Sequence, residues 1–397
     1  MSSIEGFTKT KKALILIAAS GLFLFLSLAI LEILASYYLK QGALKYYRQS
    51  TLWEFILSKP LPFAGTDDYE EVRKEWTGDT DCPKNRIVAD TATGFPRYES
   101  ANVQCNGPVT IRNGLRTTTD LIESAPSRIM FFGGSTMWGV GSADRNTIPS
   151  LIQRRLGHNT RMYGVYNYGF TSVVIRQQLR LLKSLPVNKG DIVIFYDGGN
   201  DVWNSVVYGN AEGGIIGYND ANYAKIFINR AKFYLSTHSS VYEVLGHLRN
   251  KGASSAACID LSEEVLISRA MKGFEVYQRS IEEAKKYVEN GGGHFLHFLQ
   301  PSLVSSPPLS SYKNQLISQM ADETKCGTDA FAKGYSYYRN KYATVKYSIN
   351  GTDLSSILNS GTPEEEYFWD HMHVSSNGNK AIAAAIFAFL EGKIQRN

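Results

Sequence analysis

Hydrophobic positions after about residue 125 change repeatedly between two periods. Short apolar runs alternate with longer stretches whose apolar residues recur every three to four positions, patterns that are typical of buried strands and amphipathic helices, respectively. Their alternation predicts an α/β fold, with an open, mostly parallel sheet and helices on both faces. The predicted strands are 127–134, 162–169, 191–199 and 294–301, and the predicted helices are 147–157, 172–185, 261–290 and 380–393.

One uninterrupted apolar segment lies near the N-terminus. Residues 13–31 (ALILIAASGLFLFLSLAIL) contain no charge and are long enough to cross a hydrocarbon core of about 30 Å as a helix. We therefore predict a single transmembrane anchor at 13–39. A cleaved signal peptide is the alternative, but the run exceeds the roughly 7 to 15 apolar residues of such peptides, and no small-x-small cleavage site stands clearly after it.

Basic residues on either side of this segment bear on its orientation. Lysines up to Lys12 precede it and favour a cytoplasmic N-terminus at 1–12, whereas basic residues from Lys40 onward weaken this preference. We expect a single-pass membrane protein whose main domain lies outside the cytosol, in the periplasm, the extracellular space or a lumen. The remaining chain divides into a juxtamembrane segment and irregular extension at 40–125 and an α/β domain at 126–397.

Composition and charge restrict the partners of the chain. Its 397 residues are 43% hydrophobic with a net charge of +5, which is ample material for a packed core. Lys and Arg are scattered rather than gathered into a stripe, so no nucleic acid is expected as a partner. The four cysteines lack metal-ligand spacing and allow three pairings, of which Cys82–Cys105 with Cys258–Cys326 is one; four free thiols are the alternative.

Residues suited to chemistry follow three of the predicted strands. Ser135 follows the first strand in "FGGST" and precedes a helix, whose free N–H groups favour negative charge. Gly169 ends the second strand, where the absent side chain lets a backbone N–H approach a ligand, and Asn200 follows the third in "GGND". Ligands of open α/β sheets bind at these strand ends. Each feature alone is also ordinary turn chemistry, so the local sequence leaves both interpretations open.

A carboxylate and an imidazole stand three residues apart before the last predicted helix. Asp370 and His373 in "DHMHVSSNG" share one face of a helical turn, so the carboxylate can hold the imidazole in the tautomer that a general base needs. We expect His371 to point elsewhere. The three side chains could instead bind a metal ion, but no further cluster of suitable spacing completes such a site.

Together these blocks resemble the SGNH, or GDSL-type, hydrolase family. "FGGSTMWGVG", Gly169, "GGND" and "DHMHVSSNG" match the nucleophile, glycine, asparagine and Asp-x-x-His blocks in the family's order. The resemblance spans about residues 108 to 392 and includes "RNGLR", which is similar to an element before the first strand in membrane-anchored or exported members. It implies a three-layer α/β/α, flavodoxin-like fold. Gly134 departs from the pattern, because the family signature has an aspartate there.

The resemblance also implies roles for the matched residues. Ser135 would be the nucleophile, His373 its base and Asp370 the group that orients His373. The oxyanion hole would consist of the Ser135 and Gly169 backbone N–H groups and the Asn200 side-chain amide. These roles agree with chemistry, since a serine hydroxyl needs a neighbouring base and the developing negative oxygen needs fixed donors. The reaction would be acyl transfer through an acyl-serine, with no metal and no cofactor.

The segment after Asn200 bears on the substrate. Its Gly, Asn and aromatic residues, Trp203 and Tyr208 among them, suit stacking on sugar rings, although ordinary loop packing uses the same composition. With the predicted anchor, this favours a membrane-anchored serine esterase that removes acetyl groups from a surface carbohydrate or glycolipid. The alternatives are an O-acyltransferase that acts on a glycan, a lipid esterase or thioesterase, and an inactive glycan-binding module.

Overall fold

The structure is a computed structural model that divides into two compact units, Met1–Ser50 with Ala221–Ala257 and Thr51–Asp220 with Cys258–Asn397. It describes residues 109–157, 162–212, 262–305, 311–359, 367–368 and 370–394, helical residues within 20–34 and three short strands within 87–104; for residue 305, 311–326 and those strands it describes the backbone alone. Among these residues, no helix combines the length and the apolar character that a membrane crossing requires. Most of the predicted anchor at 13–39, and the side chains of the four cysteines, lie outside the described part of the chain.

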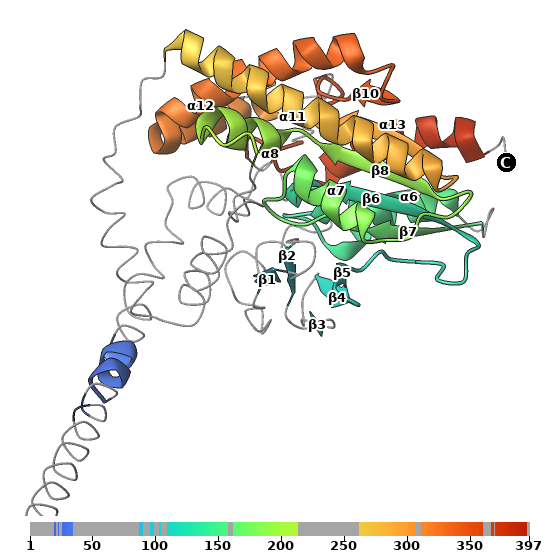
Figure 1. Ribbon diagram of the computed structural model, residues 1–397, viewed down its shortest axis with the longest axis horizontal. Helices are drawn as coiled ribbons and strands as arrows, with labels where there is room; N and C mark the ends of the chain where they lie inside the picture. The colour runs from blue at the N-terminus through green and yellow to red at the C-terminus, as the bar shows by residue number, and fades with distance from the viewer. Residues whose placement is uncertain are drawn as a thin grey trace, which may run out of the picture. The chain divides into compact units, whose positions relative to one another are not determined.

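A mostly parallel sheet forms the centre of the second unit (Figure 1). Strands β10, β9, β8, β6 and β7 run parallel, so their carboxyl ends meet at one edge, and β5, β4 and β3 extend the sheet beyond β7 as antiparallel strands. In spatial order the strands are β10 (Gly351–Asp353), β9 (His294–Leu299), β8 (Ile192–Asp197), β6 (Ser127–Gly133), β7 (Tyr163–Asn167), β5 (Leu115–Arg116), β4 (Thr110–Arg112) and β3 (Val103–Gln104). A separate antiparallel pair consists of β1 (Ile87–Ala89) and β2 (Pro96–Tyr98).

Helices cover both faces of the sheet. Because successive side chains of a strand point to opposite faces, Ile129 and Phe131 of β6 join one buried cluster, whereas Met130 and Phe132 join the other. The predicted three-layer α/β/α arrangement is therefore confirmed. The first face packs against α6 (Ile148–Leu156) and α13 (Ser376–Ile394), and the second against α7 (Ile175–Lys183), α11 (Glu263–Asn290) and α12 (Ser311–Val345). Shorter helices are α5 (Ser135–Trp138), η2 (Asp144–Asn146), α8 (Gly199–Val202), the π-helical η3 (Trp203–Val207) and η4 (Leu303–Ser305).

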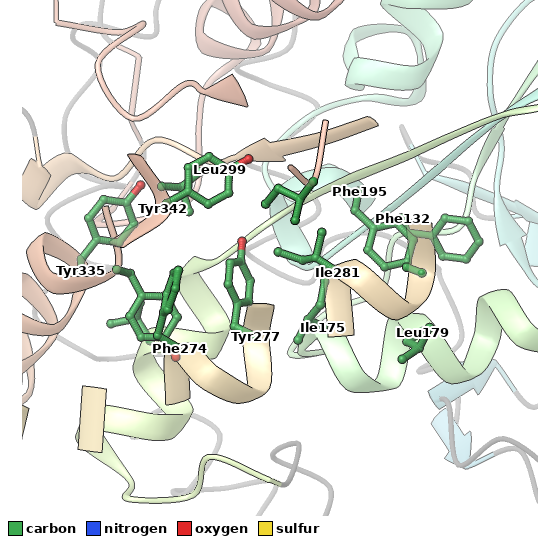
Figure 2. Packing of buried hydrophobic residues seen from close by; sticks show 14 of the residues in the cluster. Phe132, Ile175, Leu179, Phe195, Phe274, Tyr277, Ile281, Leu299, Tyr335 and Tyr342 are labelled. Atoms are coloured by element: carbon green, nitrogen blue, oxygen red, sulfur yellow. The ribbon is translucent and has the colours of Figure 1, made fainter. Parts of the chain in front are cut away.

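The second cluster is rich in tyrosine at one end. Figure 2 shows Tyr335 and Tyr342 on one side of the view, Phe132 and Phe195 on the other, and Ile281 between them. The tyrosine-rich end is built by α11 and α12, which lie side by side. This end packs under the turn that follows β8, because Tyr277 donates a hydrogen bond to the last residue of that strand, with an Oη to Oδ1 distance of 2.8 Å. The helices thereby support the carboxyl edge of the sheet.

The predicted elements agree with the structure except in three places. All four predicted strands and four predicted helices are present, with ends shifted by a few residues. The sequence did not predict α12 or β10. It also placed 40–125 outside the α/β domain, whereas β4 and β5 pair with β7 within the same sheet. The predicted boundary at 125 and 126 therefore does not separate the extension from the sheet.

Candidate active site

Ser135 stands where β6 passes directly into a helix. It is the first residue of α5, and Gly134 is the N-cap in extended conformation. A Cβ atom at Gly134 would lie 2.6 Å from the Asn200 Nδ2 atom, closer than nonbonded carbon and nitrogen atoms approach. The glycine that replaces the family's aspartate therefore lets the turn after β6 lie against the Asn200 side chain.

A continuous chain of hydrogen bonds joins three of the predicted residues. His373 Nε2 lies 2.7 Å from Ser135 Oγ, and His373 Nδ1 lies 2.6 Å from Asp370 Oδ2. The other carboxylate oxygen, Oδ1, accepts hydrogen bonds from the backbone N–H groups of Met372 at 2.8 Å and His373 at 2.7 Å. Both oxygens of Asp370 are thus engaged, which fixes the carboxylate and, through it, the imidazole ring.

Electrostatics favour the charged forms of the Asp370–His373 pair. Burial raises the pKa of the Asp370 carboxyl and lowers the pKa of the His373 imidazole, but mutual attraction and the hydrogen bond between the two groups outweigh burial in both. The pKa of Asp370 consequently lies well below its usual range, and the pKa of His373 lies above its ordinary value. Asp370 is therefore an anion across the physiological range and makes His373 a stronger base.

The three predicted oxyanion donors differ in their surroundings. The Ser135 N–H belongs to the first turn of α5, where N–H groups have no acceptor within the helix. The Asn200 amide donates one hydrogen bond to the Val173 carbonyl at 2.9 Å, which orients the group and leaves its second N–H. The Gly169 N–H, in contrast, donates to Asn167 Oδ1 at 3.0 Å. The structure thus brings Ser135 and Asn200 together around Gly134, whereas the Gly169 N–H is held by a neighbouring side chain.

The residues predicted to bind substrate lie beside the turn that carries Asp370 and His373. The Trp203 ring is partly buried and packs against the rings of Phe331 at 5.5 Å and His371 at 5.1 Å. Tyr208 is 60% exposed and meets Trp203 edge to face at 6.3 Å. His371 thus packs against aromatic rings rather than against Ser135. Burial lowers the pKa of His371, which keeps the ring neutral.

Several residues that support the site were not anticipated from the sequence. Asp201 Oδ1 accepts a hydrogen bond from the Ile175 N–H at the start of α7, and burial together with the charge of Asp197 raises the pKa of Asp201. Thr136 donates to Gln300 Oε1 at 3.3 Å, which links α5 to the end of β9. Ser172, between β7 and α7, has a left-handed backbone with φ of 61°. Among these residues, only Asp201 has a sequence signal that could have identified it as a supporting residue, namely its position directly after the "GGN" turn.

A hollow lies along the antiparallel end of the sheet. Its volume is about 1030 Å³, and it extends from the hairpin that joins β4 and β5 to Gly169. The walls combine charged and aromatic side chains, among them Arg112, Asp120, Glu123 and Tyr166. This lining suits a polar molecule that carries rings or hydroxyl groups.

The hydrogen-bonded serine, histidine and aspartate at the carboxyl edge of the sheet form the arrangement that serine hydrolases use. The chain belongs to the GDSL-like lipase/acylhydrolase family, whose model matches residues 129–386, and it is an SGNH-type ester hydrolase. No curated protein gives a significant match to the sequence.

Solved structures with a similar chain path include three esterases or hydrolases. An extracellular lipase from Streptomyces rimosus is 12% identical, with 66% of this chain and 99% of that chain covered and a TM-score of 0.37. A catalytic mutant of Axe2, an acetylxylan esterase from Geobacillus stearothermophilus, is 12% identical, with coverages of 66% and 94% and a TM-score of 0.36. LAE5, an α/β hydrolase from the metagenome of Lake Arreo, Spain, is 11% identical, with coverages of 68% and 96% and a TM-score of 0.36.

Proposed function

We propose that this ester hydrolase is a membrane-anchored serine esterase that removes O-acetyl groups from a carbohydrate or glycolipid at the cell surface. The observation that carries the catalytic part of the proposal is the pair of short hydrogen bonds that joins Ser135, His373 and Asp370. A hydroxyl, a base and an orienting carboxylate in this order are the parts that acyl transfer needs.

Each residue has a defined role in the proposed reaction. His373 Nε2 takes the proton of Ser135 Oγ as that oxygen attacks the ester carbonyl, and Asp370 stabilises the imidazolium that forms. His373 then gives the proton to the departing alcohol oxygen, which leaves an acyl-serine. Water, deprotonated by the same imidazole, attacks this intermediate and releases the acid and the free Ser135.

The negative oxygen of each tetrahedral intermediate needs donors that are already in place. We assign this role to the Ser135 N–H and to the second N–H of the Asn200 amide, whose orientation is set by Val173. The predicted contribution of Gly169 requires that its N–H leave Asn167 Oδ1. Of the three donors predicted from the sequence, the Gly169 N–H is therefore the one whose contribution the geometry supports least.

Three features support the substrate class. Trp203 and the exposed Tyr208 lie beside the turn that holds Asp370 and His373, and a hollow with charged and aromatic walls extends to Gly169. The proposed anchor at 13–39, which contains the apolar segment 13–31, would keep the domain outside the cytosol and close to surface glycans. These features favour a polar, extended substrate over a free lipid.

The test compares acyl groups and substrates on the full-length protein in detergent. The proposal expects faster hydrolysis of nitrophenyl acetate than of nitrophenyl octanoate, acetate release from acetylated oligosaccharides, and loss of both activities in Ser135→Ala. Ser356→Ala, which changes an exposed serine, is the matched control and should keep parent activity. Activity that persists in Ser135→Ala would overturn the catalytic assignment, whereas a preference for octanoate would overturn the acetyl assignment alone.

A further inference from the structure

Arg116 lies outside the matched family region at 129–386, yet its guanidinium reaches the helix that carries Ser135. We propose that Arg116 is a positioning residue that holds the carboxyl end of α5 and thereby aims the Ser135 hydroxyl and N–H. This inference rests on the proposed role of Ser135 as the nucleophile.

The guanidinium of Arg116 is fully enclosed and uses all three of its nitrogen atoms. Arg116 is 2% exposed. Its Nη1 donates to the carbonyls of Trp138 at 3.1 Å and Gly139 at 2.6 Å, its Nη2 donates to the Ser142 carbonyl, and its Nε donates to Asp144 Oδ1 at 2.9 Å. The guanidinium carbon also lies 4.4 Å from the centre of the Trp138 ring. One side chain therefore ties together the last residues of α5 and the loop that follows.

α5 needs external support because it is only one turn long. Its four residues are too few for a stable helix on their own, since the first turn costs more conformational entropy than one hydrogen bond returns. The last carbonyls of a helix have no donor within it and carry partial negative charge. A buried guanidinium at that end donates hydrogen bonds to these carbonyls and offsets their partial negative charge. If the carboxyl end were released, the first residue, Ser135, would lose its fixed direction toward His373.

A second side chain holds the same turn from the neighbouring strand. Asn167 Nδ2 lies 3.2 Å from the Met137 carbonyl and 3.4 Å from the Trp138 carbonyl, and Asn167 Oδ1 accepts the Gly169 N–H. Arg116 of β5 and Asn167 of β7 are paired across the sheet. Two residues that the β5–β7 pairing places opposite each other thus donate hydrogen bonds to the carboxyl end of α5.

Lysine is not expected to replace Arg116. A guanidinium presents five N–H groups in a planar fork, whereas an ammonium presents three on one atom and cannot reach three carbonyls and a carboxylate at once. Arg116→Lys keeps the charge and loses the fork, and Arg116→Met loses both. The pair separates the contribution of geometry from that of charge.

The experiment uses the full-length protein and measures kcat, KM and the rate at which a small fluorophosphonate labels Ser135, each normalised to the folded fraction from circular dichroism. We expect kcat and the labelling rate to fall roughly 100-fold in both Arg116 variants, as a displacement of about 1 Å at a reacting atom does, with KM within twofold of the parent. Arg128→Met is the matched control and should keep parent kcat. Arg128 lies at the start of β6, the end of the strand opposite Ser135, and its guanidinium also forms an ion pair, with Asp191.

The outcomes separate this inference from the proposed function. If folded Arg116→Met keeps kcat and labelling within twofold of the parent while Ser135→Ala is inactive, Arg116 has no positioning role and only this inference fails. If Ser135→Ala keeps parent activity, the proposed function fails and this inference fails with it. If Arg116→Met and Arg116→Lys both fail to fold while Arg128→Met folds, Arg116 is required for folding rather than for aiming Ser135, and the inference is wrong.

Discussion

Replacement of Asp370 by asparagine tests the roles of the hydrogen-bonded pair most directly. The carboxylate accepts two backbone N–H groups on Oδ1 and faces His373 Nδ1 with Oδ2. An asparagine can keep the two backbone hydrogen bonds only if its oxygen takes the place of Oδ1. Its NH₂ group then faces His373 Nδ1, which must become an acceptor and move its proton to Nε2.

This tautomer places an N–H against Ser135 Oγ, where the reaction needs a base. In serine hydrolases the wrong tautomer costs about 10⁴-fold in kcat. In the opposite orientation, the amide NH₂ group would face the backbone N–H groups of Met372 and His373. That orientation keeps the hydrogen bond to His373 Nδ1 but loses both backbone hydrogen bonds, so it is disfavoured. We therefore expect Asp370→Asn to fold and to lose about 10⁴-fold in kcat.

The same substitution has a consequence for the pH dependence. The base works when neutral, so kcat/KM rises with pH as His373 loses its proton. In the parent the charge of Asp370 and its hydrogen bond raise the pKa of His373 against the effect of burial, so the midpoint should lie above the ordinary histidine value of about 6.5. In Asp370→Asn the residual activity should rise at lower pH than in the parent.

The assay is a pH series of kcat/KM with nitrophenyl acetate, together with circular dichroism to confirm folding. Asp353→Asn is the matched control, because Asp353 also accepts a backbone N–H on Oδ1, from Ser355 at 2.8 Å, and bonds a cationic side chain, Arg339, through Oδ2. It should keep parent kinetics. A folded Asp370→Asn protein within tenfold of parent kcat, or with an unchanged midpoint, would refute the tautomer argument.

Three further predictions concern the turn after β6 and the extent of the domain. Asn200→Ala should lower kcat roughly 100- to 1,000-fold without unfolding the protein, and steady-state kinetics with thermal melts would expose a structural role instead. Gly134→Ala should lower kcat while KM stays near the parent value, because the new Cβ meets the Asn200 amide nitrogen at 2.6 Å; unchanged kcat would show that the amide can move freely. A chain that begins at residue 126 should aggregate or lack activity, because it loses Arg116 and exposes β7 as a sheet edge, whereas a chain that begins at residue 40 should be active; gel filtration and the esterase assay compare the two.

Buried strands and the order of the sequence blocks account for most of what the sequence predicted. The strands β6 and β8 are covered on both faces and therefore consist mainly of continuous apolar runs, and β9 is apolar except at His294 and His297. The pairing of Ser135 with His373, which are 238 residues apart, was implied by the resemblance to the SGNH family, whereas the rule that ligands bind at the carboxyl ends of parallel strands grouped Ser135 with Gly169 and Asn200. The roles assigned to these residues remain predictions.

Other parts depend on contacts that local sequence does not encode. α12 escaped prediction because the buried positions in its described half include Tyr335, Tyr338 and Tyr342, whose hydroxyl groups weaken the apolar pattern. The hairpin of β4 and β5 contains the "RNGLR" segment that entered the resemblance, but its pairing with β7 is a long-range contact. The hydrogen bond from the Gly169 N–H to Asn167 depends on a rotamer, and no spacing in the sequence indicates it.

The separation of the two halves of the site along the chain has a consequence for biosynthesis. Ser135 takes its place on the first central strand, whereas Asp370 and His373 enter only with the segment just before α13. A nascent chain that still lacks this segment carries Ser135 without its proposed base. By the proposed mechanism, the protein gains esterase activity only after residues 370–373 have been synthesised and lie beside Ser135, so the central strands alone cannot form the active site.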